Sequence, residues 1–440
     1  MKQNKYPLYY YLILLIAFIF SAIFWIFVFS KSINSIESNH SSIDESIYIL
    51  KPIDKDKIIN DEESKRKIVS DIVNVAIKDT TNVSASFIKD FKEKFNQEYQ
   101  IYYADSTINF FQIKLPEEKR ISFKEDVKKA LPSYDLLVWD ESIFSNKEIT
   151  SSNKDSWYLD ASNLRNVTAS NNSQNVILAI IDNGFDVSHP SFAGRIIKPF
   201  NVTNDSQNVS PANMNHGSHV ASIAAGNRVD NSSLQGICTS CKIMPIKIED
   251  NNGIMSSTYI IKGILYAIKN HADVINMSFG TEIVTNEPIP IEIQQQFIRN
   301  GAKDEESFWV ELFNYAEKNK TICVLAAGNS NMLTGFDPFQ RAKNTIKVGA
   351  VDENLKKADF SNYGSFTTIY APGTHIIGAK PNNQYEYLDG TSMASPIVSG
   401  FIALLKSQHK NADFSQIFAL LNKNTTQINN LNILKYNNLN

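Results

Sequence analysis

Residues 176–184 have the sequence VILAIIDNG, in which an apolar run, Val176–Ile181, leads directly into Asp182 and Gly184. A short continuous apolar run bounded by turn residues is typical of a strand that is buried on both faces. Asp182 closes this strand, and parallel sheets form their sites at the carboxyl ends of strands. The stretch therefore predicts a fixed, partly buried carboxylate that can orient an imidazole. A simple turn or helix-capping aspartate is the alternative.

The pattern of apolar runs bounded by turn residues continues beyond this strand. Further apolar runs alternate with helical stretches, and many of them are bounded by glycine. Strands that alternate with helices argue for a parallel sheet covered by helices on both faces. The expected strands are 176–181, 243–248, 274–278, 322–326 and 346–351, and the expected helices are 219–225, 256–270, 307–318 and 393–406.

Glycine marks where this part of the chain begins. All 17 glycines lie in residues 184–440, and the first 183 residues contain none. Glycine is the residue that tight turns with positive φ and phosphate-binding loops use most easily. Glycine-rich nucleotide loops are therefore excluded from the first part of the chain, and the site chemistry should lie beyond about residue 180.

A histidine motif follows the first strand, with the sequence HGSHVASIAAG at 216–226. His216 is expected at the start of a helix whose small residues allow close packing against the sheet. A metal site is the alternative, but no acidic helix ligand accompanies the His-x-x-His spacing, unlike zinc helices. His219 is interpreted as a structural or supporting residue.

Two further motifs contain the candidate reactive groups Ser392 and Asn329. In GTSMASP at 390–396, Ser392 opens a helix, where free N–H groups and the helix dipole can support an oxyanion. In AAGN at 326–329, Asn329 ends a buried strand and its amide can donate to the same charge. A helix cap for Ser392 and a turn residue for Asn329 are the alternatives for each motif alone.

Taken together, these motifs resemble the subtilisin-like serine proteases, or subtilases. The resemblance covers roughly Trp157 to the C-terminus and also includes the sequence NMSFG at 276–280. It implies acyl transfer, with Ser392 as nucleophile, His216 as base, Asp182 as its orienting partner and Asn329 as oxyanion donor. Asn183 and Ser218 replace the commoner threonine, and residues 281–310 look like an insertion. The substrate-binding residues that it implies are Ser278, Phe279, Gly280, Ala326, Ala327 and Gly328.

The region before the catalytic domain is charged and glycine-free. Residues 32–145 predict a small α+β domain with helices over 64–78, 85–96 and 123–131. Subtilases of this layout carry an inhibitory, folding-assisting propeptide, so the resemblance implies that role here. Residues 146–156 are expected to be a linker with the processing site, and self-cleavage is expected between about 141 and 157. The catalytic domain is then 157–440.

The N-terminus predicts a membrane segment. Leu8–Ser30 is free of charge and long enough to span a bilayer, and Lys2 and Lys5 precede it. Residues 1–31 are therefore expected to be a cytoplasmic stub and a transmembrane signal-anchor. The catalytic domain is then outside the cytoplasm, membrane-bound through residues 8–30 or secreted after processing. A long cleaved signal peptide is the alternative.

Composition limits the partners. A net charge of −3 gives no reason to expect a nucleic-acid partner. Cys238 and Cys241 allow a zinc site, a local disulfide or two free thiols. No cofactor is required, although the resemblance leaves calcium as an option, with Asp205, Asp250 and Asp352 as candidate ligands.

The sequence predicts a serine endopeptidase zymogen whose partners are polypeptide substrates and its own propeptide. Two alternatives stay open. One is a catalytically inactive subtilase-like binding domain, which the retention of all four site residues argues against. The other is a maturation protease dedicated to one exported peptide.

Overall fold

The computed structural model describes residues 47–78, 83–146, 149–151, 156–169, 173–211, 215–229, 233–285 and 287–437. The predicted membrane segment, Leu8–Ser30, lies outside these residues. Within the described part of the chain, no helix has the length and apolar character needed to cross a membrane.

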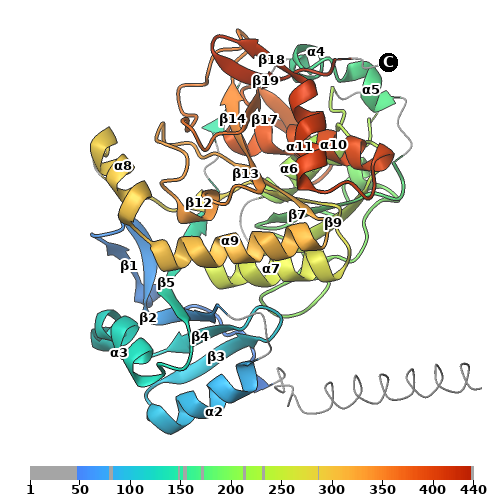
Figure 1. Cartoon of the computed structure of the whole chain (residues 1–440). Coiled ribbons are helices and arrows are strands. Elements are labelled where there is room, and N and C mark those ends of the chain that lie inside the picture. The colour runs from blue at the N-terminus through green and yellow to red at the C-terminus, as the bar shows by residue number, and fades with distance from the viewer. Residues whose placement is uncertain are drawn as a thin grey trace, which may run out of the picture.

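The larger half of the molecule is built on a nine-stranded sheet, which lies behind the helices in Figure 1. Its centre is parallel, because β9, β7, β11, β13, β14 and β15 lie side by side with all neighbours running the same way. Short strands complete the two edges. The nine strands are β7 (Ile177–Asp182), β8 (Phe200–Asn201), β9 (Lys242–Lys247), β11 (Val274–Met277), β13 (Ile322–Ala326), β14 (Thr345–Val351), β15 (Ile369–Pro372), β18 (Thr425–Ile428) and β19 (Leu431–Leu434).

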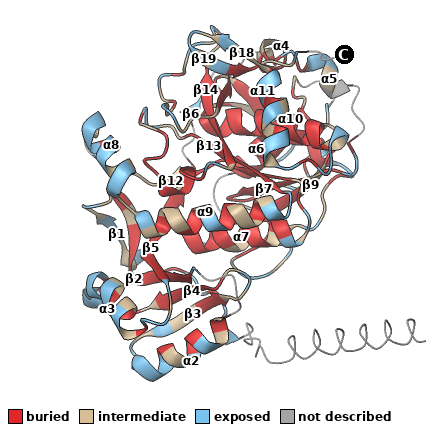
Figure 2. Cartoon of the chain, viewed as in Figure 1, coloured by how far each residue is buried: buried red, intermediate tan, exposed pale blue. Residues whose placement is uncertain are grey.

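Helices cover both faces of this sheet, as predicted. Alternate residues of β7 show why: Leu178 and Ile180 pack into the core on the side of α6 and α10, whereas Ala179 and Ile181 pack on the side of α7 and α9. Figure 2 shows the buried layer that results between strands and helices. The helices of this half are α4 (Trp157–Ala161), α5 (Arg165–Ala169), α6 (His216–Ala225), α7 (Ser257–Lys269), α8 (Ile291–Asn300), α9 (Lys303–Lys318), α10 (Thr391–Gln408) and α11 (Phe414–Lys423).

The smaller N-terminal unit is an antiparallel sheet with two helices on one face. Its strands are ordered β5-β2-β4-β3, with β1 paired to β2. Phe87 and Phe91 of α2 and Phe123 of α3 fill one face of the sheet. The other face packs on α7 and α9 of the larger half (Figure 1). The elements are β1 (Ile58–Asp61), β2 (Arg66–Ile77), α2 (Ser84–Lys94), β3 (Gln100–Asp105), β4 (Phe110–Lys114), α3 (Arg120–Ala130) and β5 (Leu136–Ser145).

One predicted element of this unit is wrong. The helix expected over 64–78 is the long strand β2. Val73, Val75 and Ile77 face α2 and α3, while Ile72 and Ala76 face the larger half, so both faces of the strand are buried. A strand buried on both faces has no polar side, and its run of β-branched residues favours β structure over a helix.

The end of β5 leaves its own unit and enters the larger half. There it lies between two short strands, β10 (Met255–Ser256) and β12 (Gly280–Thr281), and pairs with both of them in antiparallel fashion. Phe144 is opposite Met255 on one side and Thr281 on the other, and Ser145 is opposite Gly280. The N-terminal unit therefore contributes the end of β5 as a strand that pairs with two strands of the larger half, β10 and β12.

The predicted linker is partly structured. Strand β6 (Ile149–Thr150) joins a three-stranded sheet with β16 (Ile376–Lys380) and β17 (Gln384–Asp389). Leu388 is opposite Thr150 in this sheet, only four residues before Ser392. The predicted insertion begins with β12 and contains α8 and the start of α9.

Candidate active site

The predicted acid and base lie in contact. Asp182 is the last residue of β7, and His216 is the first residue of α6. The His216 Nδ1 atom is 2.9 Å from Oδ1 and 3.0 Å from Oδ2 of Asp182, and both side chains are fully buried. Gly217 makes this approach feasible, because a Cβ atom at its position would lie 2.4 Å from the carbonyl oxygen of Gly184.

Ser392 is the second residue of α10, beside β11 and its following loop. Its hydroxyl donates to the carbonyl oxygen of Ser278 at 3.1 Å, and the Ser278 hydroxyl donates back to the carbonyl oxygen of Ser392 at 3.0 Å. Asn276 adds a buried polar link, since its Oδ1 accepts hydrogen bonds from the hydroxyls of Ser395 and Ser399 at 2.9 and 2.8 Å. These bonds fix the start of α10 against the sheet.

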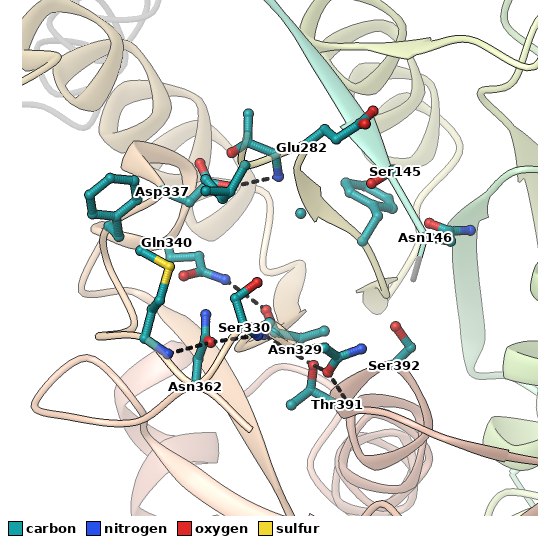
Figure 3. A pocket seen from close by; sticks show the side chains of 18 residues that line it. Ser145, Asn146, Glu282, Asn329, Ser330, Asp337, Gln340, Asn362, Thr391 and Ser392 are labelled. Carbon is teal, nitrogen blue, oxygen red and sulfur yellow. Dashed lines mark hydrogen bonds between the residues drawn. The ribbon is translucent and has the colours of Figure 1, made fainter. Parts of the chain in front are cut away.

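Asn329 is oriented by a neighbour that sequence reasoning missed. The backbone N–H and the hydroxyl of Thr391 both donate to Asn329 Oδ1, at 2.9 and 2.8 Å. With its oxygen held in this way, the amide presents Nδ2 as its donor beside Ser392 (Figure 3). Gly328 has φ +105°, and a Cβ atom there would lie 2.4 Å from Asn362. Only glycine fits such a turn without strain.

One pocket of about 340 Å³ brings together most of the predicted residues. Ser392, Asn329, Phe279, Gly280, Ala326 and Gly328 line it. Two predicted residues lie just behind its wall: Ser278 bonds to Ser392, and the carbonyl oxygen of Ala327 accepts from Asn362 and Gln340 at 2.9 and 3.0 Å. Further lining residues from the insertion and the 330–340 loop are Thr281, Glu282, Ile283, Met332, Phe336 and Asp337.

Asn146 is the other residue that the sequence did not identify. Its Nδ2 atom is 2.7 Å from Asp182 Oδ1 and 3.0 Å from His216 Nδ1. It directly follows β5, so the N-terminal unit places an amide against the acid and base. Its place one residue past the predicted propeptide domain was the one available indication.

His219, interpreted from the sequence as a structural or supporting residue, is fully buried. Its Nε2 atom lies 3.2 Å from the carbonyl oxygen of Glu386, and the ring packs on Gly378. Burial, together with the nearby His216, lowers the pKa of His219 to about 3. This second histidine is therefore neutral at ordinary pH.

The cysteine alternatives are resolved. Cys238 and Cys241 form a disulfide, which excludes the zinc site and the free thiols. Cys323 is a buried free thiol.

The candidate calcium ligands do not fit a calcium site. Asp205 pairs with Lys262 at 2.7 Å, while Asp250 and Asp352 accept backbone N–H groups of their own loops. Across the described ranges, no three His, Cys, Asp or Glu side chains converge as metal ligands. Calcium needs six to eight oxygen ligands, which these aspartates do not assemble.

Comparison with known proteins decides the family. The model of the subtilase family matches residues 173–437. The chain belongs to the subtilase family. Among its relatives, a thermophilic serine proteinase of Bacillus sp. (strain AK1) is 31% identical over 80% of this chain and 85% of its own length. Thermitase of Thermoactinomyces vulgaris is 33% identical over 53% of this chain and 76% of its own. The protein is thus a subtilisin-like serine endopeptidase.

Solved structures agree on the fold. Fervidolysin from Fervidobacterium pennivorans, a keratinolytic enzyme related to subtilisin, superposes with a TM-score of 0.66 at 21% identity, over 88% of this chain and 62% of that one. The epidermin leader peptide processing serine protease (EpiP) of Staphylococcus aureus gives a TM-score of 0.66 at 20% identity, over 83% of this subtilase and 97% of that chain.

Proposed function

We propose that this subtilase hydrolyses peptide bonds through Asp182, His216 and Ser392. We further propose that its N-terminal unit inhibits the enzyme, as in a zymogen, until autoproteolysis separates the two. The single observation that carries the proposal is the path of β5. The strand ends in the cleft, and Asn146 contacts both Asp182 and His216.

The catalytic steps follow from the positions of the side chains. Ser392 Oγ turns from Ser278 toward His216 and attacks the substrate carbonyl carbon, while its proton passes to the imidazole. Asp182 holds Nδ1–H and stabilises the imidazolium. Asn329 Nδ2 and the Ser392 N–H donate to the oxyanion. The imidazolium then gives its proton to the leaving amine, and water hydrolyses the acyl-enzyme by the same route.

Three contacts support the proposed inhibitory and folding-assisting role of the N-terminal unit. Arg66 of β2 forms a buried two-point ion pair with Glu305 of α9, with Nη2–Oε2 at 2.7 Å. Lys128 of α3 pairs with Asp304, also at 2.7 Å. Glu141 of β5 accepts the Thr258 N–H and the Ser257 and Thr258 hydroxyls at 2.9–3.1 Å. Glu141 therefore caps the start of α7, whose first N–H groups have no partner within the helix.

Processing is expected within a few residues after Asn146, inside the range of 141–157. It would separate the catalytic domain from the N-terminal unit and from the predicted signal-anchor that precedes it. We therefore propose export as a membrane-anchored precursor, followed by release of the catalytic domain.

The experiment compares wild type with Ser392→Ala. A serine-directed fluorophosphonate should label the wild type alone, and N-terminal sequencing should find a new terminus soon after residue 146 in the wild type alone. Ser407→Ala, near the other end of the same helix, is the matched control and should be labelled and processed. Active protein that still carries residues 47–146 covalently would overturn the zymogen proposal. An unlabelled wild type would favour an inactive binding domain.

A dedicated maturation protease is the second candidate. The observation in its favour is the similarity in fold to a leader-peptide processing protease, which extends over 97% of that chain. Cleavage of a mixed peptide library separates the two functions. A general protease cuts many sequences, whereas a dedicated one cuts few.

A further inference from the structure

We infer that the pocket beside Ser392 selects a lysine or arginine side chain immediately before the scissile bond, and that Asp337 and Glu282 are the residues that select it. This inference rests on the proposed function and adds the substrate class. It starts from the charges on the pocket wall.

The pocket wall carries negative charge only. Of the 18 described residues that line it, two are carboxylates, Asp337 and Glu282, and none is Lys, Arg or His. Figure 3 shows both acids on the side of the pocket away from Ser392. A side chain that enters past the nucleophile therefore meets Asp337 at its far end, with Glu282 at the pocket edge. Met332 and Phe336 line the same pocket and can pack along an aliphatic stem.

Asp337 is held rigidly. Its Oδ2 accepts the Thr281 N–H at 2.9 Å, and its Oδ1 accepts the Phe339 N–H at 3.1 Å. It is 7% exposed, so a cation that reached it would be largely shielded from water. A carboxylate fixed in this way binds a cationic donor more strongly than a mobile surface acid does.

The nearby guanidinium groups are bound to other carboxylates. Arg341 Nη1 is 3.0 Å from Glu306, and Arg66 Nη2 is 2.7 Å from Glu305. Burial lowers the pKa of Arg66, but Glu305 and, to a smaller extent, Asp337 raise it overall. Asp337 also acts on Arg341, where it partly offsets the lowering of the pKa by burial. Arg66 belongs to the N-terminal unit and would leave with it on processing, whereas Arg341 stays in the mature enzyme, bound to Glu306.

Thr281 supplies an independent observation. Its hydroxyl oxygen is buried without a hydrogen-bond partner, and the residue is only 8% exposed while lining the same pocket. A buried hydroxyl without a partner is costly, which suggests that a bound group completes it. An ammonium or guanidinium group at Asp337 has N–H donors to spare for this oxygen.

Glu282 already binds a cation in the zymogen. Lys67 of β2 forms an ion pair with its carboxylate, and the Lys67 N–H also donates to the Glu282 carbonyl oxygen at 3.1 Å. Processing removes Lys67 together with the N-terminal unit. The mature cleft would then present Glu282 without this partner, in the same pocket as Asp337.

The chain offers a substrate of the inferred class at its own processing site. β5 carries Phe144 and Ser145 along the cleft as far as Asn146, and the next residue in the sequence is Lys147. A cut after Lys147 would leave Glu148 as the new N-terminus.

The test uses matured enzyme, counted by fluorophosphonate titration. The substrates are peptides Phe-Ser-Asn-X joined to a fluorogenic amine, in which X is Lys, Arg, Leu or Glu. We expect kcat/KM for Lys and Arg to exceed that for Leu by about tenfold or more, with Glu the poorest substrate. Asp337→Asn and Glu282→Gln should each reduce the ratio of Lys to Leu. Glu311→Gln, an exposed acid of α9 outside the pocket, is the matched control.

Self-processing gives a second readout in the full chain. Lys147→Ala should slow the appearance of the mature enzyme, whereas Lys154→Ala, in the same linker, should not. Equal cleavage of the Leu and Lys peptides, or a ratio that neither pocket variant changes, would overturn the inference. In both cases labelling and cleavage would leave the proposed function standing, whereas an enzyme that is neither labelled nor processed would contradict the proposed function itself.

Discussion

The side-chain amide of Asn146 donates to Asp182 Oδ1 at 2.7 Å, where the carboxylate also contacts His216 Nδ1 at 2.9 Å. A residue of the N-terminal unit therefore shares the carboxylate that orients the imidazole in the proposed mechanism. The contact is buried, since Asn146 is 8% exposed. Hydrogen bonds to a charged group contribute about 1.5–3 kcal/mol, so this one should matter for inhibition.

Asn146→Ala should therefore weaken the binding of the cleaved N-terminal unit to the catalytic domain. The expected rise in the apparent dissociation constant is about tenfold or more, measured by dilution of the processed complex and titration of the active sites released. Ser145→Ala is the control, because its backbone pairing with Gly280 does not depend on its side chain. An unchanged constant for Asn146→Ala would show that strand pairing alone holds the unit.

Asn329→Ala removes the proposed side-chain donor to the oxyanion. We expect kcat to fall by roughly 10²–10³, a magnitude known from a subtilisin, with little change in KM. Thr391→Val removes one of the two donors to Asn329 Oδ1 and should cause a smaller loss of kcat. Asn331→Ala, an exposed neighbour, should leave turnover near wild type. A loss confined to KM in Asn329→Ala would indicate a role in ground-state binding instead.

The sequence predicted the catalytic half well because its motifs sit at strand and helix ends. Asp182 is the last residue of β7 and His216 is the first residue of α6. A correct prediction of the ends of these two elements therefore also gives the positions of the two side chains. Thr391, inside the same motif as Ser392, escaped notice because its role depends on Asn329, 62 residues away in the chain.

The N-terminal unit was harder to predict. The sequence pattern of β2 predicts a helix because the second buried face of this strand is made by α7 and α9, which come much later in the chain. Asn146 and Asp337 were missed for the same reason. Their partners come from distant elements, and neither residue stands in a motif of its own.

The disulfide between Cys238 and Cys241 closes a short loop. The chain-entropy model gives such a loop a stabilisation of only about 2 kcal/mol. Reduction, or Cys238→Ser with Cys241→Ser, should therefore lower the thermal midpoint of the mature enzyme by about 5 °C and leave it folded. Scanning calorimetry with and without reductant measures this shift, with Cys323→Ala treated in the same way to separate effects of the buried thiol. Unfolding on reduction at room temperature would contradict this estimate.

His219 should make the fold sensitive to acid. Its pKa is about 3 in the folded protein because of burial, against about 6.5 for an unperturbed histidine. Below pH 6.5 the unfolded chain binds a proton that the folded chain does not. Stability is therefore complete above pH 6.5 and falls by about 1.4 kcal/mol per pH unit between 6.5 and 3 from this residue alone.

His219→Gln tests this acid sensitivity while keeping a side chain that can donate to the carbonyl oxygen of Glu386. The variant should lose stability at pH 8 through poorer packing on Gly378, but its unfolding free energy should fall less steeply between pH 6.5 and 5. The difference in slope should approach one proton, and denaturant titrations at several pH values measure it. His271→Gln is the control, because this histidine is exposed on the surface. Parallel pH profiles for wild type and His219→Gln would show that another group takes up the proton on unfolding.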